Sequence, residues 1–411
     1  MHMPVSKTRH RGRRTVASAA IGLLLMGSTA TQAHADSTRS QQWYLDAMHA
    51  DEMWRTSTGK GITVAVIDTG VDADNPDLKG RVLDGKDFAP STRAGDEYTD
   101  YDGHGTGMAG LIAGTGAYGG GNGAFGLARG ADILPVRMPG TDEVNPFAVS
   151  SYFSKAIRYA ADSRAQVINI SMGGGMSTPE LTEAVRYALD KGSLVFAAVG
   201  NDADKTHHID YPAATPGVVG VAAVGKNLRR TSWSQYGPQV DLSAPGEDMV
   251  HACGGKTGLC KTSGTSDATA LASASAALIW SKHPTWTNNQ VLRVMLNTIG
   301  GPTDGAKRND SIGYGIVRPR IALQNPGDPG PADEYPLPDL TAAASAPPSA
   351  EGTGPNGTSA KSKENSTAVA ASAEDGGSGL FWIGLGVGAV VLLGGAVTAV
   401  VVGRRRHVRD T

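Results

Sequence analysis

Ser266 lies in a stretch that could place a reactive hydroxyl at the beginning of a helix. Residues 264–270 read Gly-Thr-Ser-Asp-Ala-Thr-Ala, and an alanine-rich run follows at 271–278. A serine between a glycine turn and such a run presents its hydroxyl and the free backbone N–H groups outward. This suits a nucleophile beside an oxyanion site. Serine is also a common helix N-cap, and the stretch by itself favours that simpler role.

Two further residues could complete an acid–base system with Ser266. Asp68 follows the apolar run 62–67, so we expect it at the carboxyl edge of a buried strand, where open α/β sheets bind ligands. His104 lies among glycines, which leave its ring accessible and let backbone approach closely. Each residue has a simpler alternative, because Asp often stabilises turns and a lone His is more often structural. Together, carboxylate, imidazole and hydroxyl can perform acyl transfer.

Two more segments are expected to bring polar groups to the same edge. Asn201 follows the apolar run 194–199 and Gly200, and its side-chain amide could donate to a developing oxyanion. The residues after the run 167–170 would leave extended backbone beside the site; they are Ser171, Met172 and Gly173.

The elements that must position these residues alternate along the chain. Continuous apolar runs bounded by turn residues are expected to be strands buried on both faces: 62–67, 133–136, 167–170, 194–199 and 218–224. Helical patterns lie between them at 147–162 and 179–191. This alternation predicts an α/β fold with a parallel sheet flanked by helices.

The chain order Asp68, His104, Ser266 is that of subtilisin-like triads, whereas chymotrypsin-like enzymes and α/β-hydrolases use other orders. The sequence resembles the subtilases, peptidase family S8, over about residues 43–323. The motifs that carry this resemblance are Val66–Gly70, Gly103–Thr106, Gly200–Asn201, Tyr211–Ala214, Ser243–Gly246, Gly264–Ser266 and Gly313–Gly315.

The resemblance implies a subtilisin-like serine endopeptidase that needs no cofactor. It implies that Ser266 attacks the peptide carbonyl, His104 transfers the proton and Asp68 orients the imidazole. It further implies that Asn201 and the backbone N–H of Ser266 hold the oxyanion, and that residues 171–173 pair with the substrate backbone as an added strand.

Three residues near the proposed nucleophile depart from the family pattern. Ala270 and Ala274 stand where the family usually has Pro and Gly. Asp267 would oppose the charge of a developing oxyanion unless it is directed away or neutralised. These departures leave a second hypothesis open: a protease-like scaffold that stabilises a secretion complex, with low or dispensable activity.

Both ends of the chain indicate export. A basic segment, an apolar run at 16–26 and Ala33-His34-Ala35 predict a cleaved signal peptide. An uncharged apolar run at 380–402 exceeds the roughly 20 residues that cross a bilayer, and arginines follow it. The expected organisation is a signal peptide at 1–35, an N-terminal extension at 36–60, a catalytic domain at 61–324, a Pro/Ala/Ser/Gly-rich linker at 325–379, a transmembrane helix at 380–402 and a basic cytoplasmic tail at 403–411.

This organisation is most similar to that of the mycosins, the membrane-anchored subtilases of actinobacterial type VII secretion systems. The similarity implies a single-pass protein of the cell membrane with an extracellular catalytic domain and a cytoplasmic C-terminus. It also implies exported proteins or peptides as substrates, and contact with the secretion complex in the membrane.

Net charge and cysteine content limit which other ligands and cross-links the sequence allows. Residues 36–403 hold 28 basic and 38 acidic side chains, a net charge of −10, which argues against nucleic-acid binding. Cys253 and Cys260 are expected to form a disulfide in an exported protein. No metal site is expected. Asp72, Asp74 and Asp77 match only part of a calcium loop, which here lacks its glycine and final glutamate.

Overall fold

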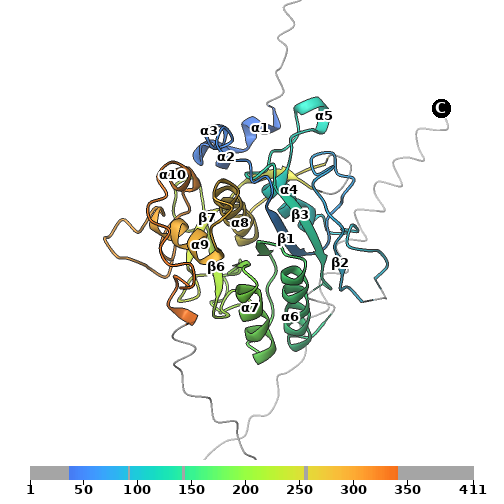
Figure 1. Cartoon of the computed structure of the whole chain (residues 1–411). Coiled ribbons are helices and arrows are strands. Elements are labelled where there is room, and N and C mark those ends of the chain that lie inside the picture. The colour runs from blue at the N-terminus through green and yellow to red at the C-terminus, as the bar shows by residue number, and fades with distance from the viewer. Residues whose placement is uncertain (1–36, 91–92, 141–143, 254–257, 341–411) are drawn as a thin grey trace, which may run out of the picture. The chain divides into compact units, whose positions relative to one another are not determined.

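A seven-stranded sheet forms the centre of the protein, in the order β2-β3-β1-β4-β5-β6-β7 with every neighbouring pair parallel (Figure 1). The computed structural model describes residues 37–90, 93–140, 144–253 and 258–340. The strands are β1 (Thr63–Asp68), β2 (Lys86–Asp87), β3 (Asp132–Arg137), β4 (Val167–Ile170), β5 (Leu194–Ala198), β6 (Val218–Val224) and β7 (Leu242–Pro245). The predicted parallel α/β fold is confirmed.

The sheet is covered by helices on both faces, and β1 shows how its strands serve both layers. Val64 and Val66 point into a core shared with α4 (His104–Ala113) and α8 (Thr265–Lys282). Ala65 and Ile67 point into a second core shared with α6 (Pro146–Asp162) and α7 (Pro179–Asp190). Because alternate residues of a strand face opposite sides, a strand covered on both faces must be apolar throughout. This explains the continuous apolar runs.

The helices of the second layer begin where the sequence predicts. The Asn145 side chain accepts from the Ala148 N–H at the start of α6, and the Thr178 side chain accepts from the Leu181 N–H at the start of α7. Each cap is followed by a proline, whose missing N–H costs nothing at that position. The strands β2 and β7 were not predicted, because β2 is very short and β7 reads Leu-Ser-Ala-Pro rather than as an apolar run.

Helix α8 runs through the interior of the domain. Every residue from Thr265 to Trp280 is buried, and the helix packs against β4, β5, β6 and β7. Its many alanine and serine side chains allow this close approach on all sides. The remaining elements are α1 (Thr38–Gln41), α2 (Trp43–Ala47), α3 (Ala50–Met53), α5 (Tyr118–Gly121), α9 (Asn288–Asn297), α10 (Pro319–Gln324) and the antiparallel hairpin β8 (Met249–Ala252) and β9 (Leu259–Thr262).

The N-terminal extension lies against the domain. The Gln42 side chain donates to the carbonyls of Phe125 and Val250 and accepts from the Phe125 N–H. Tyr44 is fully buried, and its hydroxyl donates to the Val250 carbonyl at 2.8 Å. These contacts tie α1–α3 to the β8–β9 hairpin and to the loop before β3.

The first part of the expected linker belongs to the packed domain, which corrects the predicted boundary at residue 325. The Arg293 guanidinium donates to the backbone carbonyls of Pro329, Pro331 and Glu334. Leu337 is 1% exposed within the main core. Proline-rich composition suggested a free spacer, but an arginine that satisfies several carbonyls and one buried leucine hold the segment in place up to residue 340.

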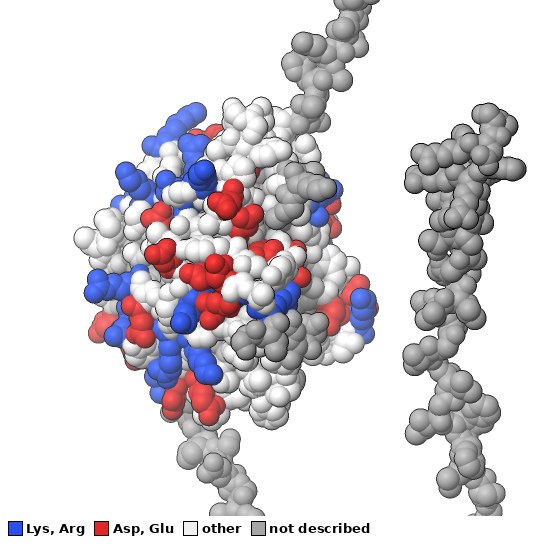
Figure 2. All heavy atoms as spheres, turned by 90° about the vertical axis from the view of Figure 1, so that its right-hand side faces the viewer, with Lys and Arg blue, Asp and Glu red and all other residues white. Residues whose placement is uncertain are grey.

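The expected signal peptide, the rest of the linker, the expected transmembrane helix and the basic tail lie outside the described residues. Within the described ranges, no helix is long and apolar enough to cross a membrane. On the face shown in Figure 2, Asp and Glu side chains form a central group, and Lys and Arg lie mostly around it.

We expect Leu337→Ala to lower the free energy of unfolding by about 2–4 kcal/mol, because the change leaves a cavity under residues 325–340. The measurement is chemical unfolding of the full chain, followed by tryptophan fluorescence. Leu228→Ala is the matched control, since Leu228 is 54% exposed and should change stability by less than about 0.5 kcal/mol. Equal effects of the two substitutions would show that the segment does not contribute to the core.

Candidate active site

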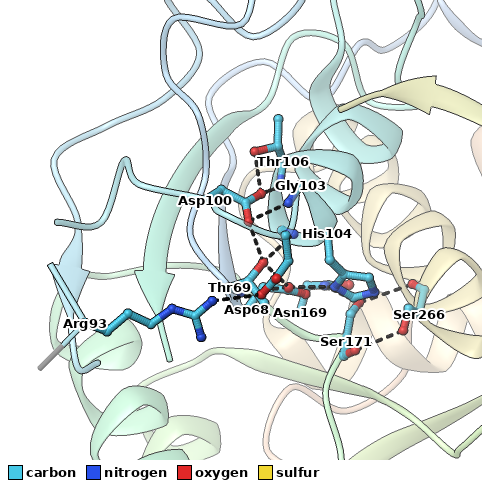
Figure 3. Close-up of polar contacts among 12 residues, drawn as sticks. Asp68, Thr69, Arg93, Asp100, Gly103, His104, Thr106, Asn169, Ser171 and Ser266 are labelled. Carbon is cyan, nitrogen blue, oxygen red and sulfur yellow. Dashed lines mark hydrogen bonds and ion pairs between the residues drawn. The ribbon is translucent and has the colours of Figure 1, made fainter. Parts of the chain in front are cut away.

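Three neighbouring strands end at the same edge of the sheet and deliver the polar residues there. In the order β1, β4, β5, strand β1 ends at Asp68, β4 is followed by Ser171, and β5 is followed by Gly200 and Asn201. His104, Ser171, Asn201 and Ser266 line one cleft with a volume of about 470 Å³. The structure thus brings the sequence-predicted residues together, as Figure 3 shows for several of them.

The Asp68 carboxylate and the His104 imidazole form the central polar contact of the cleft. Asp68 is fully buried, and its Oδ1 lies 2.7 Å from His104 Nδ1 (Figure 3). Oδ1 also accepts from the Thr69 N–H, whereas Oδ2 is buried without a hydrogen-bond partner. The Asp68 charge raises the pKa of His104 to about 9, although burial of the imidazole opposes this shift. The carboxylate therefore stabilises the imidazolium and fixes the ring.

Asp100 positions both partners and was missed by sequence reasoning. Its Oδ1 accepts from the Thr69 hydroxyl and the Gly103 N–H, and its Oδ2 accepts from the N–H and hydroxyl of Thr106. These contacts hold the loop after β1 against the first turn of α4 (Figure 3). The only signal was an acid shortly before a helix start, which is too common to single out.

The glycines beside His104 are needed for packing. Gly103 has φ 74°, a left-handed conformation that favours glycine, at the N-cap of α4. A Cβ on Gly105 would lie 2.1 Å from the Gly70 carbonyl oxygen, and one on Gly107 would lie 2.5 Å from the His251 ring. These close approaches let α4 begin directly above β1.

Ser266 is the second residue of α8 and does not cap it. The N-cap is Gly264, so the simpler N-cap interpretation of Ser266 is wrong. Its hydroxyl donates to the Ser171 carbonyl at 2.9 Å, and the Ser171 hydroxyl donates to the Ser266 carbonyl at 3.2 Å. Ser266 Oγ thus lies in the cleft beside His104, with its hydrogen bond directed to the backbone after β4.

A buried polar chain sets the position of α8 relative to β4. The Ser273 hydroxyl donates to Asn169 Oδ1, Asn169 Nδ2 donates to the Ser171 hydroxyl, and that hydroxyl donates to the Ser266 carbonyl. In this series of hydrogen bonds, each donor donates once and each acceptor accepts once. The signal in the sequence was Asn169, a polar residue inside an otherwise apolar strand.

The side-chain amide of Asn201 is oriented by the start of α8. Its Oδ1 accepts from the Thr265 N–H at 2.7 Å and from the Thr265 hydroxyl at 2.9 Å. The oxygen therefore satisfies one of the N–H groups that lack a partner within the helix, and the NH₂ group remains as a donor. Asn201 is exposed in the cleft, so this donor can act on a bound oxyanion.

Asp267 is directed away from the cleft. Its carboxylate therefore does not face the place where an oxyanion would develop. It is 2% exposed, and its Oδ1 accepts from the Thr262 hydroxyl, which lies 2.7 Å from His251 Nε2. His251 Nδ1 donates to the Ala252 carbonyl. The Thr262 hydroxyl contacts both His251 Nε2 and Asp267 Oδ1 but has only one proton to donate. The other contact needs a proton on His251 or on Asp267, so these two residues share one additional proton. The group is then neutral, in keeping with burial that raises the pKa of Asp267 to about 7.

The other departures are accommodated without a break in α8. Ala270 and Ala274 are fully buried inside a continuous helix, where alanine is the most favourable residue. Cys253 and Cys260 form a disulfide at the end of the β8–β9 hairpin.

The partial calcium motif has a structural role instead. Asp77 accepts from the N–H groups of Tyr118 and Ala124, and Asp72 accepts from the Asp74 N–H. Among the described residues, no group of three or more His, Cys, Asp or Glu side chains is arranged to hold a metal ion.

Comparison with known proteins identifies the family. The family model described as "Subtilase family", Peptidase S8, matches residues 59–315. The chain therefore belongs to the subtilases and is a subtilisin-like serine protease. It is 36% identical over 240 residues to an intracellular serine protease of Paenibacillus polymyxa, covering 57% of this chain and 71% of that protein. It is 37% identical over 236 residues to subtilisin NAT of Bacillus subtilis subsp. natto, covering 57% and 59%.

Solved structures add the similarity to mycosins. MycP1 from Mycobacterium smegmatis superposes with a TM-score of 0.63 at 27% identity, covering 71% of this chain and 86% of MycP1. MycP3 from the type VII (ESX-3) secretion system superposes with a TM-score of 0.59 at 31% identity, covering 68% of this chain and 87% of MycP3.

We expect Asp267→Asn to stabilise the protein more at pH 8 than at pH 5. The folded-state pKa of Asp267 is raised from 3.8 to about 7, so the native state holds its proton more tightly than the unfolded chain. Stability from this proton is lost as pH rises toward 7. The increase in the free energy of unfolding that Asp267→Asn produces should be about 2–3 kcal/mol larger at pH 8 than at pH 5.

The measurement is chemical unfolding of wild type and variant at both pH values. Asp204→Asn, at an exposed aspartate, serves as the control for loss of one negative charge. A gain that does not change with pH would contradict the shared-proton arrangement of Asp267, Thr262 and His251.

Proposed function

We propose that the protein is a membrane-anchored extracellular serine endopeptidase with Asp68, His104 and Ser266 as its triad, and that it processes exported proteins in type VII secretion. The observation that carries the proposal is the buried Asp68–His104 contact of 2.7 Å in the cleft that also presents Ser266. Family membership supports the chemistry, and the likeness to MycP1 and MycP3 supports the secretion role.

In the proposed reaction, Ser266 Oγ leaves the Ser171 carbonyl and attacks the scissile carbonyl carbon. His104 accepts the hydroxyl proton and then donates it to the leaving amine, and water completes the second half of the reaction with the same base. Asp68 compensates the imidazolium charge. The Asn201 amide and the Ser266 N–H stabilise the oxyanion, a contribution worth roughly 100- to 1000-fold in turnover for the asparagine of subtilisin, a relative.

The backbone at 171–173 would hold the peptide as an added strand. This segment leaves β4 at the sheet edge and reaches the cleft with all three residues. A peptide bound there lies across the carboxyl ends of β4 and β5, with its scissile bond between Ser266 and Asn201. The run at 380–402 with its arginines, and the predicted signal peptide, support the membrane location.

The test is covalent labelling with a membrane-impermeant fluorophosphonate on intact cells that express the full chain. We expect labelling of the wild type and none of Ser266→Ala. Asn201→Ala should label and turn over more slowly, by roughly 100-fold or more. A chain that ends at residue 379 should be labelled in the medium, because it lacks the proposed anchor.

The alternative is a scaffold whose proteolytic activity is low or dispensable. The hydrogen bond of Ser266 to Ser171 rather than to His104 is the observation that favours it. Absence of a Ser266-dependent adduct in folded, processed protein would rule out the enzyme. Labelled protein whose Ser266→Ala variant still supports secretion would show that the protease and the secretion role are separate.

We expect kcat/KM to rise with pH toward a plateau, with a midpoint set by the free enzyme's His104 pKa of about 9, because only neutral imidazole accepts the proton. Asp68→Asn removes the main cause of that raised pKa. In this variant the midpoint of the kcat/KM pH profile should move to lower pH. The plateau of kcat/KM should fall by about 10⁴-fold, the order typical of a triad that loses its acid. A pH profile that keeps its midpoint in the variant would show that Asp68 does not control His104.

A further inference from the structure

Part of the cleft is a slot lined mainly by glycine and alanine. One wall is Gly173 and Gly174 after β4, and the other is Ala198 and Gly200 at the end of β5. Met172 also lines the cleft, and it packs partly against the core that β4 shares with α6 and α7. Walls of glycine and alanine admit a long unbranched side chain.

The carboxylate of Asp210 closes this slot. A Cβ on Gly173 would lie 3.0 Å from Asp210 Oδ2, and a Cβ on Gly200 would lie 3.2 Å from the same atom. The oxygen is therefore between the two walls. Oδ1 accepts from the Gly174 N–H at 3.0 Å, so the backbone of one wall holds the carboxylate in place, with 19% of the side chain exposed.

A second carboxylate, Asp202, lies at the same end of the cleft. Gln235 Nε2 donates to Asp202 Oδ1 at 2.8 Å and to the Thr206 carbonyl at 2.7 Å. Both partners are acceptors, so they fix the orientation of the amide. The same Nε2 lies 3.2 Å from His208 Nδ1.

His208 makes only long contacts with the two carboxylates. Its Nε2 reaches Asp210 Oδ2 only at 3.4 Å, and its Nδ1 lies 3.7 Å from Asp202 Oδ1. One imidazole carries at most one positive charge, so it cannot balance both carboxylates. Among the described residues that line the cleft, none is lysine or arginine.

We propose that this slot receives a lysine or arginine side chain from the residue on the acyl side of the scissile bond, with Asp210 as its charge partner. The inference rests on the proposed function and narrows its substrates to proteins cleaved after a basic residue. The glycine walls accommodate the aliphatic stem, and Asp210 Oδ2 receives the cationic end. Asp202 adds a second negative charge at the same end of the cleft.

A purely structural role for Asp210 is the competing explanation, since Oδ1 holds Gly174. That role requires only the oxygen that accepts from the N–H, and an asparagine supplies it equally well. Among the described residues, no lysine or arginine forms an ion pair with this carboxylate, and His208 Nε2 approaches Oδ2 only to 3.4 Å. An acid that serves only the loop would not need to lie between two glycine walls.

The test compares cleavage of otherwise identical peptides that carry lysine, arginine, norleucine or glutamate at the acyl-side position, by full-length protein. We expect kcat/KM for lysine and arginine to exceed that for norleucine by at least about tenfold, with glutamate slowest. In Asp210→Asn the ratio of kcat/KM for the lysine peptide to kcat/KM for the norleucine peptide should fall about tenfold. Asp204→Asn, which removes a charge outside the cleft, should keep the preference.

Binding to Ser266→Ala, measured by calorimetry with the lysine and norleucine peptides, keeps the inference testable without catalysis. Tighter binding of the lysine peptide, lost in the double variant with Asp210→Asn, supports the slot even if labelling of Ser266 fails. Equal binding of both peptides, or equal loss for both in the double variant, overturns it. Labelling of Ser266 without a preference for basic residues would support the proposed protease and overturn only the proposed specificity.

Discussion

The burial of one negative charge governs the arrangement of the cleft. Asp68 ends the interior strand β1 and is fully buried, and His104 compensates its charge at 2.7 Å. A buried carboxylate without a partner would be costly, so the first turn of α4 has to lie over the end of β1. The glycines around His104 and the bridging carboxylate of Asp100 serve that requirement. The raised pKa of His104 is the direct electrostatic consequence.

Helix α8 supplies the other half of the site because the domain can enclose it completely. Its small side chains let it pass between the sheet and the remaining helices, and the chain from Ser273 through Asn169 to Ser171 sets its position against β4. Asn201 then accepts from the first turn of α8. The contact that positions the helix therefore also orients the amide donor, so Ser266 and Asn201 are placed by the same interactions.

Two acids near Ser266 have opposite consequences because of what surrounds them. Asp267 is enclosed by the β8–β9 hairpin and shares a proton with His251 through Thr262, so it adds little charge beside Ser266. Asp210 faces the cleft between glycine walls and keeps an oxygen directed toward it. Burial without a cation favours the neutral form of a carboxyl, whereas access to the cleft lets a substrate provide the counter-charge.

The order of motifs and the apolar runs determined the parallel sheet and the family, and they predicted Asp68, His104, Asn201 and Ser266 as site residues. These features can be read from the sequence because the burial pattern of a strand and a short motif are both local. Tertiary structure alone decided the linker boundary, the role of Ser266, the protonation of Asp267 and the direction of Asp210. The linker boundary depended on carbonyls that a distant Arg293 satisfies, and the role of Ser266 at the start of α8 depended on Ser171. The state of Asp267 and the direction of Asp210 depended on partners far along the chain. A sequence shows which charges are present, but only the fold determines which of them are buried, paired or open to a substrate.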